Sequence, residues 1–266
     1  DGKELAEVLK VHPEYLGERH KGENTLPILI KFIDAKKDLS VQVHPTDAFA
    51  QEHENGQLGK TEMWYVLDAG RDAKLVYGLK KDCTKEEMSK AIADGTVMKY
   101  LQKVPIHKDD LFFIPAGTVH AIGAGALVAE IQESSNLTYR VYDYGRVGAD
   151  GRPRELHIDK ALAVARREPP KDPVGPTEPE RAVAGGRIQP LFSCDKFTTE
   201  TPTGEGEMAD SVSPESFVSL LVLAGEGTIK HGGETYPVKK GQSVFLPAGL
   251  GDYALTGRMK LLRTRV

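Results

Sequence analysis

The chain has 266 residues, of which 39% are hydrophobic and 28% charged, which is ordinary for a soluble globular protein of one large or two medium domains. Its formal net charge of -4 gives no indication of a nucleic-acid or membrane-surface partner, and no apolar run approaches the length of a membrane span. The two cysteines, Cys83 and Cys194, match no metal-binding spacing, so we expect the reducing cytoplasm rather than a disulfide scaffold.

Helical and strand patterns alternate along the first two thirds of the chain. Apolar residues recur at helical spacing over residues 1–18, and residues 155–167 predict another helix. Residues 84–104 predict one or two helices, with Thr84 as the N-cap and Glu87 three residues later, as in a capping box. Apolar runs bounded by turn residues predict strands within residues 26–45, 62–69, 73–79 and 109–134.

A segment rich in proline and charge, residues 168–180, predicts a linker or a long surface loop. We therefore expect a domain boundary near residue 170. The first predicted domain, residues 1–170, has helical additions. The second, residues 171–266, is strand-like over most of its length.

The two predicted domains share a weak internal repeat. "FIPAGTVH" at 113–120 resembles "FLPAGLGD" at 245–252, and "YVLDAG" at 65–70 resembles "LVLAGEG" at 221–227. Two copies of one strand-turn-strand unit predict two similar β-barrels, and the Pro-Ala-Gly motif with its following histidine resembles the cupin family. We expect a mainly β fold with two cupin-like, jelly-roll barrels and added α-helices.

The stretch "LSVQVHP" at 39–45 has one polar and one apolar face. Side chains two apart on a strand share a face, so Ser40, Gln42 and His44 lie together. Strands that line a barrel can direct inward side chains to one point, which brings Glu62 and His120 into the same group. Imidazole, carboxylate and amide donors suit a divalent ion such as zinc, so we interpret the polar face as a metal face.

Each of these residues has a plainer interpretation when taken alone. His44 by itself is more often a structural histidine, Glu62 by itself is more often a solvated charge, and spacing alone leaves both interpretations open. In the second copy of the repeat, Val218 stands opposite Glu62 and Asp252 opposite His120, so we expect that barrel to be structural. We interpret the six other histidines as surface or structural residues: His12, His20, His53, His107, His157 and His231.

Four longer motifs identify a family resemblance. "LSVQVHP", "GKTEMWYVLDA", "PAGTVHAIGAG" and "EIQESSNLTYRVYDYGR" resemble the short bacterial form of type I mannose-6-phosphate isomerase, from about residue 24 through 160 and more loosely beyond. The resemblance implies one Zn2+ per chain, held by Gln42, His44, Glu62 and His120. Residues 1–170 would then be a metal-binding catalytic cupin domain, and residues 171–266 a cupin-like domain without a metal site. It also implies a sugar-phosphate substrate, catalytic residues Lys60, Glu130 and Arg140, and substrate-binding residues Ser40, Lys60 and Arg140. Members of this family have a further N-terminal segment, so we expect a fragment or a barrel completed differently.

The implied reaction interconverts mannose 6-phosphate and fructose 6-phosphate. A proton leaves C2 of the open-chain sugar and returns to C1 through an enediol, and the carrier needs a titratable group within hydrogen-bond reach. Glu130 and Lys60 are candidates for this role, and so are a metal-bound water and a histidine. Arg140 suits an oxyanion or the phosphate, the alternative being a salt bridge to Asp143 or Glu133. We expect the tyrosines of "TYRVYDYGR" to serve mainly in packing: Tyr139, Tyr142 and Tyr144.

Two other functions stay open at this point. One is an iron-dependent cupin dioxygenase, against which the Gln ligand and the Lys60 and Arg140 pair argue. The other is a non-enzymatic, sugar-phosphate-binding cupin. The sequence leaves open a monomer or a homodimer, and histidine and glutamate ligands also accept manganese, cobalt or iron.

Overall fold

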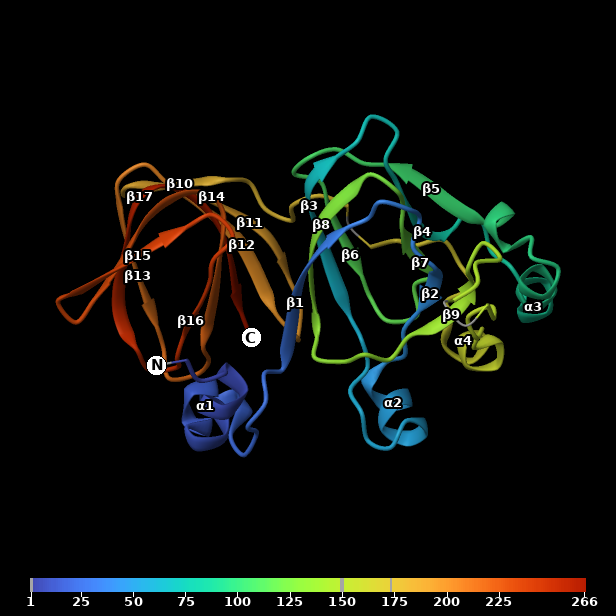
Figure 1. Cartoon of the computed structure of the whole chain (residues 1–266), viewed down its shortest axis with the longest axis horizontal. Helices are drawn as coiled ribbons and strands as arrows, with labels where there is room; N and C mark the ends of the chain where they lie inside the picture. Colours follow the sequence, from blue (N-terminus) through green and yellow to red (C-terminus); the bar gives the residue numbers. More distant parts are fainter. Residues whose placement is uncertain (1, 149–150, 173) are drawn as a thin grey trace. The chain divides into compact units, whose positions relative to one another are not determined.

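The computed structural model describes residues 2–148, 151–172 and 174–266, and its fold is mainly β, as predicted (Figure 1). The chain forms two compact units, Leu29–Gly175 and the combination of Asp1–Ile28 with Pro176–Val266. None of the helices in these described ranges is long and apolar enough to cross a membrane.

This division differs from the predicted domains 1–170 and 171–266, because the N-terminal helices join the second unit. Glu18 N donates a hydrogen bond to Pro214 O at 3.0 Å, and Ala248 N donates to Tyr15 O at 2.9 Å. Such long-range main-chain bonds satisfy polar groups that the short helices leave unpaired, and they leave no trace in the local sequence pattern. The segment consists of α1 (Leu5–Val11) and two short 3-10 helices, Pro13–Leu16 and Glu18–His20.

Two antiparallel sheets form the unit Leu29–Gly175. The four-stranded sheet has the order β1 (Ile28–Asp34), β8 (Ala126–Glu133), β3 (Glu62–Ala69) and β6 (Leu111–Ile114). The five-stranded sheet has the order β5 (Leu101–Pro105), β4 (Lys74–Leu79), β7 (His120–Ile122), β2 (Val41–Val43) and β9 (Tyr139–Tyr142). Buried side chains from both sheets share one core, which includes Trp64, Leu75, Phe112 and Val128. Packing of the two inner faces gives the predicted jelly-roll arrangement.

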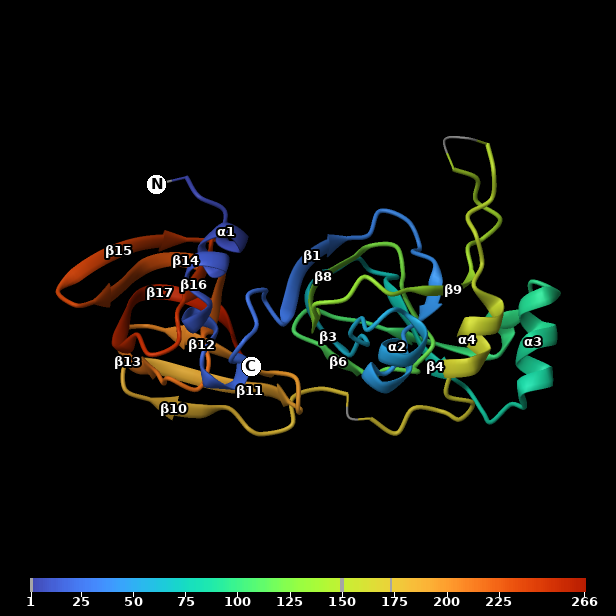
Figure 2. The same cartoon turned by 90° about the horizontal axis from the view of Figure 1, so that it is seen from below.

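Helices cover the outer face of the five-stranded sheet. α3 (Lys85–Ala93) and α4 (Ile158–Val164) lie side by side in both views (Figures 1 and 2). Their apolar residues join a second core with outward-facing residues of β2, β7 and β9. The predicted capping box is confirmed, since Thr84 Oγ1 accepts from Glu87 N while a Glu87 oxygen accepts from Thr84 N.

Two boundaries differ from the predictions for this region. Residues 101–104, predicted as helix, belong to β5, where Leu101 pairs with Leu79 and Val104 with Leu75. Pairing with β4 outweighs helix propensity there because it satisfies the backbone and buries Leu101 at the same time. A short helix, α2 (Asp47–His53), follows β2 and has Thr46 as its N-cap.

One eight-stranded antiparallel sheet dominates the other unit. Its main order is β10 (Arg181–Val183), β11 (Gly186–Ser193), β12 (Thr198–Gly204), β17 (Gly251–Arg265), β14 (Val218–His231) and β15 (Glu234–Lys239). In addition, β13 (Glu207–Val212) pairs with β17 and β16 (Ser243–Leu246) with β14. Gly225 follows a register shift in β14, has a φ of 74°, and lies where a Cβ would approach Arg258 O to 2.0 Å. A larger residue is excluded at this bulge for both reasons.

Candidate metal centre and active site

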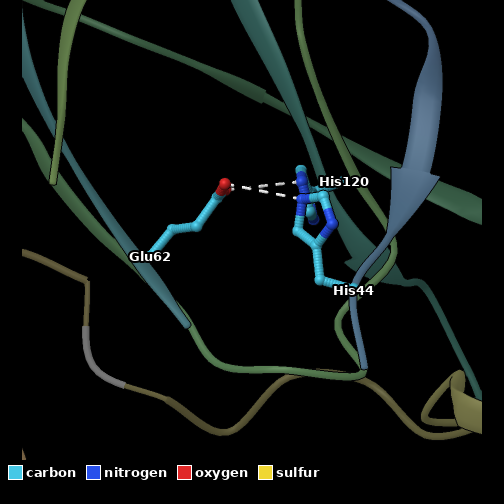
Figure 3. Close-up of side chains that lie close together, drawn as sticks. All are labelled: His44, Glu62 and His120. Atoms are coloured by element: carbon cyan, nitrogen blue, oxygen red, sulfur yellow. Dashed lines mark ion pairs between the residues drawn. The ribbon is translucent and has the colours of Figure 1, made fainter. Parts of the chain in front are cut away.

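Two histidines and a glutamate meet between the two sheets of the unit Leu29–Gly175. Glu62 begins β3 of the four-stranded sheet, while His120 begins β7 and His44 follows β2 in the five-stranded sheet. His44 Nε2 lies 3.4 Å from Glu62 Oε1, and His120 Nε2 lies 3.5 Å from Glu62 Oε2 (Figure 3). All three are buried. In the described part of the chain this is the one group of three such residues close enough to hold a metal ion.

Strand register brings the fourth predicted ligand to the same place. Gln42 is the Cα partner of His120 on one side and of Arg140 on the other. Paired residues on neighbouring strands direct their side chains to the same face, so Gln42, His120 and Arg140 form a row. The amide nitrogen of Gln42 lies 3.4 Å from His120 Nε2. The structure therefore brings together all four predicted metal ligands.

Main-chain carbonyls orient both imidazoles. His44 Nδ1 donates to Leu137 O at 2.7 Å, and His120 Nδ1 donates to Thr118 O at 2.8 Å. Since a carbonyl can only accept, both rings carry their proton on Nδ1 and present Nε2 toward Glu62. The Pro-Ala-Gly turn contributes as well, because Gly117 N donates to His44 O at 2.9 Å and ties the turn to this ligand.

Burial and charge set the protonation states that a metal requires. Burial lowers the pKa of His44 and lowers the pKa of His120 to about 3, so both rings are neutral near pH 7. Burial alone would raise the pKa of Glu62, but the positive charge of Lys60 lowers it, and the pKa lies below its ordinary value. Neutral imidazoles and an ionised carboxylate are the forms that bind divalent cations.

The carboxylate of Glu62 provides the test of whether a metal fits this site. Both of its oxygens are fully buried, and neither accepts a hydrogen bond from any residue that the structure describes. Lys60 forms an ion pair with Glu62 Oε1, and its Nζ lies 3.2 Å from His44 Nε2. The ion pair with Lys60 offsets the charge of the carboxylate, but the lone pairs of its buried oxygens accept no hydrogen bond from the described residues, and such buried polar atoms are costly unless a ligand contacts them. The residues therefore fit a bound divalent cation.

Glu130 lies on β8, on the inner face that also carries Glu62. Its Cα partner is Trp64, whose Nε1 donates to Glu130 Oε2 at 3.1 Å. Lys31 Nζ, from β1, lies 3.2 Å from Glu130 Oε1 and donates to Gln132 Oε1 at 2.5 Å. Burial raises the pKa of Glu130, and the nearby charge of Glu62 raises it further. Two donors thus orient a carboxyl group whose pKa is raised above that of an ordinary glutamate.

Lys31 and Trp64 were absent from the predicted site. Lys31 offered a detectable pattern, since it is the one cation within the apolar strand "LPILIKFID". A charged residue at such a position requires a partner when its neighbours are buried. Trp64 is indistinguishable from an ordinary core residue in the sequence, because it lies in the continuous apolar run "MWYVL".

Arg140 and Ser40 occupy the same part of the five-stranded sheet. Ser40 directly precedes β2 and is buried. Arg140 Nη1 donates to Glu155 O at 2.8 Å, whereas its Nε is buried and has no hydrogen-bond partner among the described residues. The alternative salt bridge to Asp143 is not formed, because Asp143 is paired with Arg146 and Arg154. Burial lowers the pKa of Arg140, and repulsion from Arg154 adds to this effect.

The tyrosines of the same segment have packing roles. Tyr139 belongs to the core beneath α3 and α4, and its hydroxyl donates to Glu54 Oε1 at 2.7 Å. The rings of Tyr142 and Tyr144 meet edge to face at 4.9 Å, and Arg146 lies over Tyr144. These contacts agree with the expected packing role.

The second unit has different residues at the positions compared in the repeat. Val218, opposite Glu62, is a buried core residue, and Asp252, opposite His120, is exposed. The inward position of β17 belongs to the next residue, Tyr253, whose hydroxyl contacts Asp210. The repeat therefore preserves the turn but not the chemistry of the first copy.

Known proteins resemble this chain along nearly its whole length. The profile described as "Phosphomannose isomerase type I, catalytic domain" matches residues 1–98, and "Mannose-6-phosphate isomerase, cupin domain" matches residues 188–266. Mannose-6-phosphate isomerase ManA of Bacillus subtilis is 40% identical over 256 residues, which is 95% of this chain and 78% of that protein. Mannose-6-phosphate isomerase of Streptococcus mutans is 37% identical over 264 residues, covering 98% and 80%.

Solved structures resemble the fold. The crystal structure of mannose 6-phosphate isomerase from Bacillus subtilis matches with a TM-score of 0.90 at 35% identity, covering 100% of this chain and 83% of that one. The apo form of the enzyme from Salmonella typhimurium has a TM-score of 0.75 at 16% identity, covering 98% and 85%, which is a likeness of fold. Members of the type I family are metal-dependent, and the buried His-Glu-His group can hold a metal. The extent and identity of these matches show that the chain belongs to the type I phosphomannose isomerase family.

Proposed function

We propose that this chain interconverts mannose 6-phosphate and fructose 6-phosphate, with one Zn2+ held by Gln42, His44, Glu62 and His120. The observation that carries the proposal is the buried His44-Glu62-His120 group, with Lys60 in contact with it. The names of the relatives at 37% and 40% identity support the same reaction. Cys83 is a buried, free cysteine, which supports a reducing compartment, the cytoplasm.

The donor set favours zinc over harder cations. Two imidazole nitrogens and a carboxylate, with the amide oxygen of Gln42 as a fourth donor, are ligands typical of zinc, whereas magnesium and calcium prefer all-oxygen sets. When bound, the cation would supply a Lewis acid that polarises substrate oxygens. It also compensates the buried charge of Glu62.

Glu130 is the residue that we propose as the proton carrier. Isomerisation moves a proton from C2 of the open-chain aldose to C1 of the ketose, so one group must accept it and return it. The raised pKa of Glu130 makes its carboxylate a stronger base than an ordinary glutamate. Trp64 and Lys31 hold both carboxyl oxygens, which limits the rotation of the group. Lys60, a buried cation beside Glu62, stabilises negative charge that develops on the substrate oxygens.

Arg140 and Ser40 are proposed to bind the substrate. The buried Nε of Arg140 is a donor without a partner among the residues described, and it lies in the row that contains Gln42 and His120. A guanidinium group in this position suits a phosphate or an enediol oxygen, both of which accept hydrogen bonds and carry negative charge. The hydroxyl of Ser40, next to β2, suits a sugar hydroxyl.

The direct test couples turnover of mannose 6-phosphate to detection of fructose 6-phosphate. Wild-type protein is assayed as purified, after treatment with a chelator, and after zinc is added back. His120→Ala is the site variant, and His107→Ala is its control because His107 is exposed. We expect turnover that the chelator abolishes and zinc restores, that is lost in His120→Ala, and that is retained in the control.

Other outcomes of the same assay identify the alternatives. A folded, zinc-loaded protein without turnover would refute the isomerase and leave a sugar-phosphate-binding cupin. Activity that returns with Fe2+ rather than zinc and consumes oxygen would instead identify a dioxygenase.

A further inference from the structure

The main chain at Arg140 is held from two sides. On one side Arg140 is paired with Gln42 of β2. β9 is the last strand of its sheet in the described part of the chain, so the other edge of Arg140 has no neighbouring strand. A residue from a distant segment takes the place of that strand. His157 N donates to Arg140 O at 2.8 Å, and Arg140 N donates to His157 Nδ1 at 3.1 Å.

This arrangement requires one particular tautomer of His157. A ring nitrogen that accepts a hydrogen bond from a backbone N–H cannot carry a proton itself, so the neutral ring is protonated at Nε2. The side chain thus supplies the acceptor that a strand carbonyl would otherwise provide. An edge N–H without such an acceptor would be left to water, and the strand end would fray more easily.

The same segment also holds the side chain of Arg140. Glu155 O, two residues before His157, accepts from Arg140 Nη1 at 2.8 Å. His157 O accepts from Ala161 N at 2.8 Å in the first turn of α4, which packs against β9. The position of the guanidinium group is therefore fixed through residues 155–157, while its buried Nε is left without a partner in the described structure.

We propose that His157 is a positioning residue for Arg140. Its ring Nδ1 and its backbone N–H lock the main chain of β9 at the residue that binds the substrate's phosphate or developing oxyanion. The proposal rests on the proposed function of Arg140 and assigns His157, which the sequence indicates only as a surface or structural residue, to the isomerase reaction.

The test compares three substitutions at His157 in the zinc-loaded enzyme. His157→Asn places an oxygen acceptor where Nδ1 lies, two bonds from Cβ. His157→Gln places its polar atoms one bond further along, at the position of Nε2, and His157→Ala removes the acceptor. We expect kcat/KM to fall about tenfold in His157→Ala and His157→Gln, the effect of one lost hydrogen bond, and to stay within about twofold of wild type in His157→Asn. Equal losses in Asn and Ala would overturn the proposal.

A double-substitution cycle separates positioning from general destabilisation. If His157 acts through Arg140, His157→Ala should have no further effect on kcat/KM in an Arg140→Ala background. Independent, multiplicative losses would contradict the proposal. His107→Ala is the matched control, since it removes an exposed imidazole and should leave kcat/KM unchanged.

The ring tautomer gives a readout that does not depend on turnover. The 15N NMR shifts of His157 should identify the form protonated at Nε2. The form protonated at Nδ1 would overturn the positioning role of His157 even if the variants failed to fold. Wild-type turnover tests the proposed function by itself. An inactive wild type with the expected tautomer would therefore refute the isomerase, and an active wild type with the other tautomer would refute the role of His157.

Discussion

The substitution Glu62→Gln tests the electrostatics of the candidate metal centre in the metal-free protein. It keeps the size of the side chain but removes the negative charge that faces Lys60. Glu62 is 0% exposed and Lys60 is 4% exposed, so the stranded ammonium group has no access to water. Removing one partner of a buried ion pair costs about 3 kcal/mol or more, because the remaining charge is uncompensated. For a chain of this size that corresponds to a fall in Tm of roughly 6 to 12 °C.

Thermal unfolding in the presence of a chelator measures this effect. The control is the double variant Lys60→Met with Glu62→Gln, which removes both charges and should recover most of the lost stability. With zinc at 100 times its Kd, the wild type should gain about 2.7 kcal/mol, and Glu62→Gln should gain much less because a ligand is missing. The reasoning would be refuted if chelated Glu62→Gln were as stable as wild type, or if removing Lys60 as well lowered stability further.

Three further predictions concern the reaction, the loss of stability at low pH and the second unit. Glu130→Gln should lower kcat by about 100-fold or more while the protein stays folded and binds zinc, since it removes the proposed proton carrier; near-normal kcat in this variant would assign the role elsewhere. Hydrogen bonds from Arg154 and, to a lesser extent, from Arg146 hold the pKa of Asp143 below its ordinary 3.8, although burial opposes them. The ionised Asp143 therefore stabilises the fold above pH 3.8, and this stabilisation is lost as the pH falls through the folded pKa. Asp143→Asn should therefore lower stability at pH 7 and lessen the acid-induced loss below pH 3.8, as followed by denaturant melts across pH, and a pH-independent difference would count against this cause. Arg263 is buried between Glu200 and Asp210, so Arg263→Met should lower the free energy of unfolding by about 3 kcal/mol and leave the zinc content unaltered. Calorimetry measures the first effect, and metal analysis would reveal any coupling to the candidate metal centre.

Local patterns in the sequence were sufficient for several features of this protein. The alternation in "LSVQVHP" predicts that Gln42 and His44 share a face, because a strand directs every second side chain to the same side. Thr84 and Glu87 predict the start of α3, because a capping box involves groups only three residues apart. The repeated Pro-Ala-Gly turn predicts two related β units. In each case the physical cause acts within a few residues, so the sequence contains it in readable form.

Features that depend on distant segments were decided by the tertiary structure. The register of β2 against β7 and β9 brings Gln42 beside His120 and Arg140, although 78 residues separate Gln42 from His120. Pairing with β4 likewise placed residues 101–104 in β5 rather than in the predicted helix. Main-chain hydrogen bonds at Tyr15 and Glu18 joined the N-terminal helices to the C-terminal unit. Sequence patterns report propensity, whereas register follows from which segments bury and hydrogen-bond each other.

The difference between what the sequence determines and what the tertiary structure decides is clearest at the candidate site. The sequence by itself determined the kinds of chemistry available, since the residue types of the four proposed metal ligands and of Lys60, Glu130 and Arg140 suit metal binding and proton transfer. Only the tertiary structure decided that Lys31 and Trp64 orient Glu130, and that His157 closes the open edge of β9 at Arg140. These partners come from segments far away in the chain, and their contacts exist only because the packed sheets and helices hold them within hydrogen-bond distance.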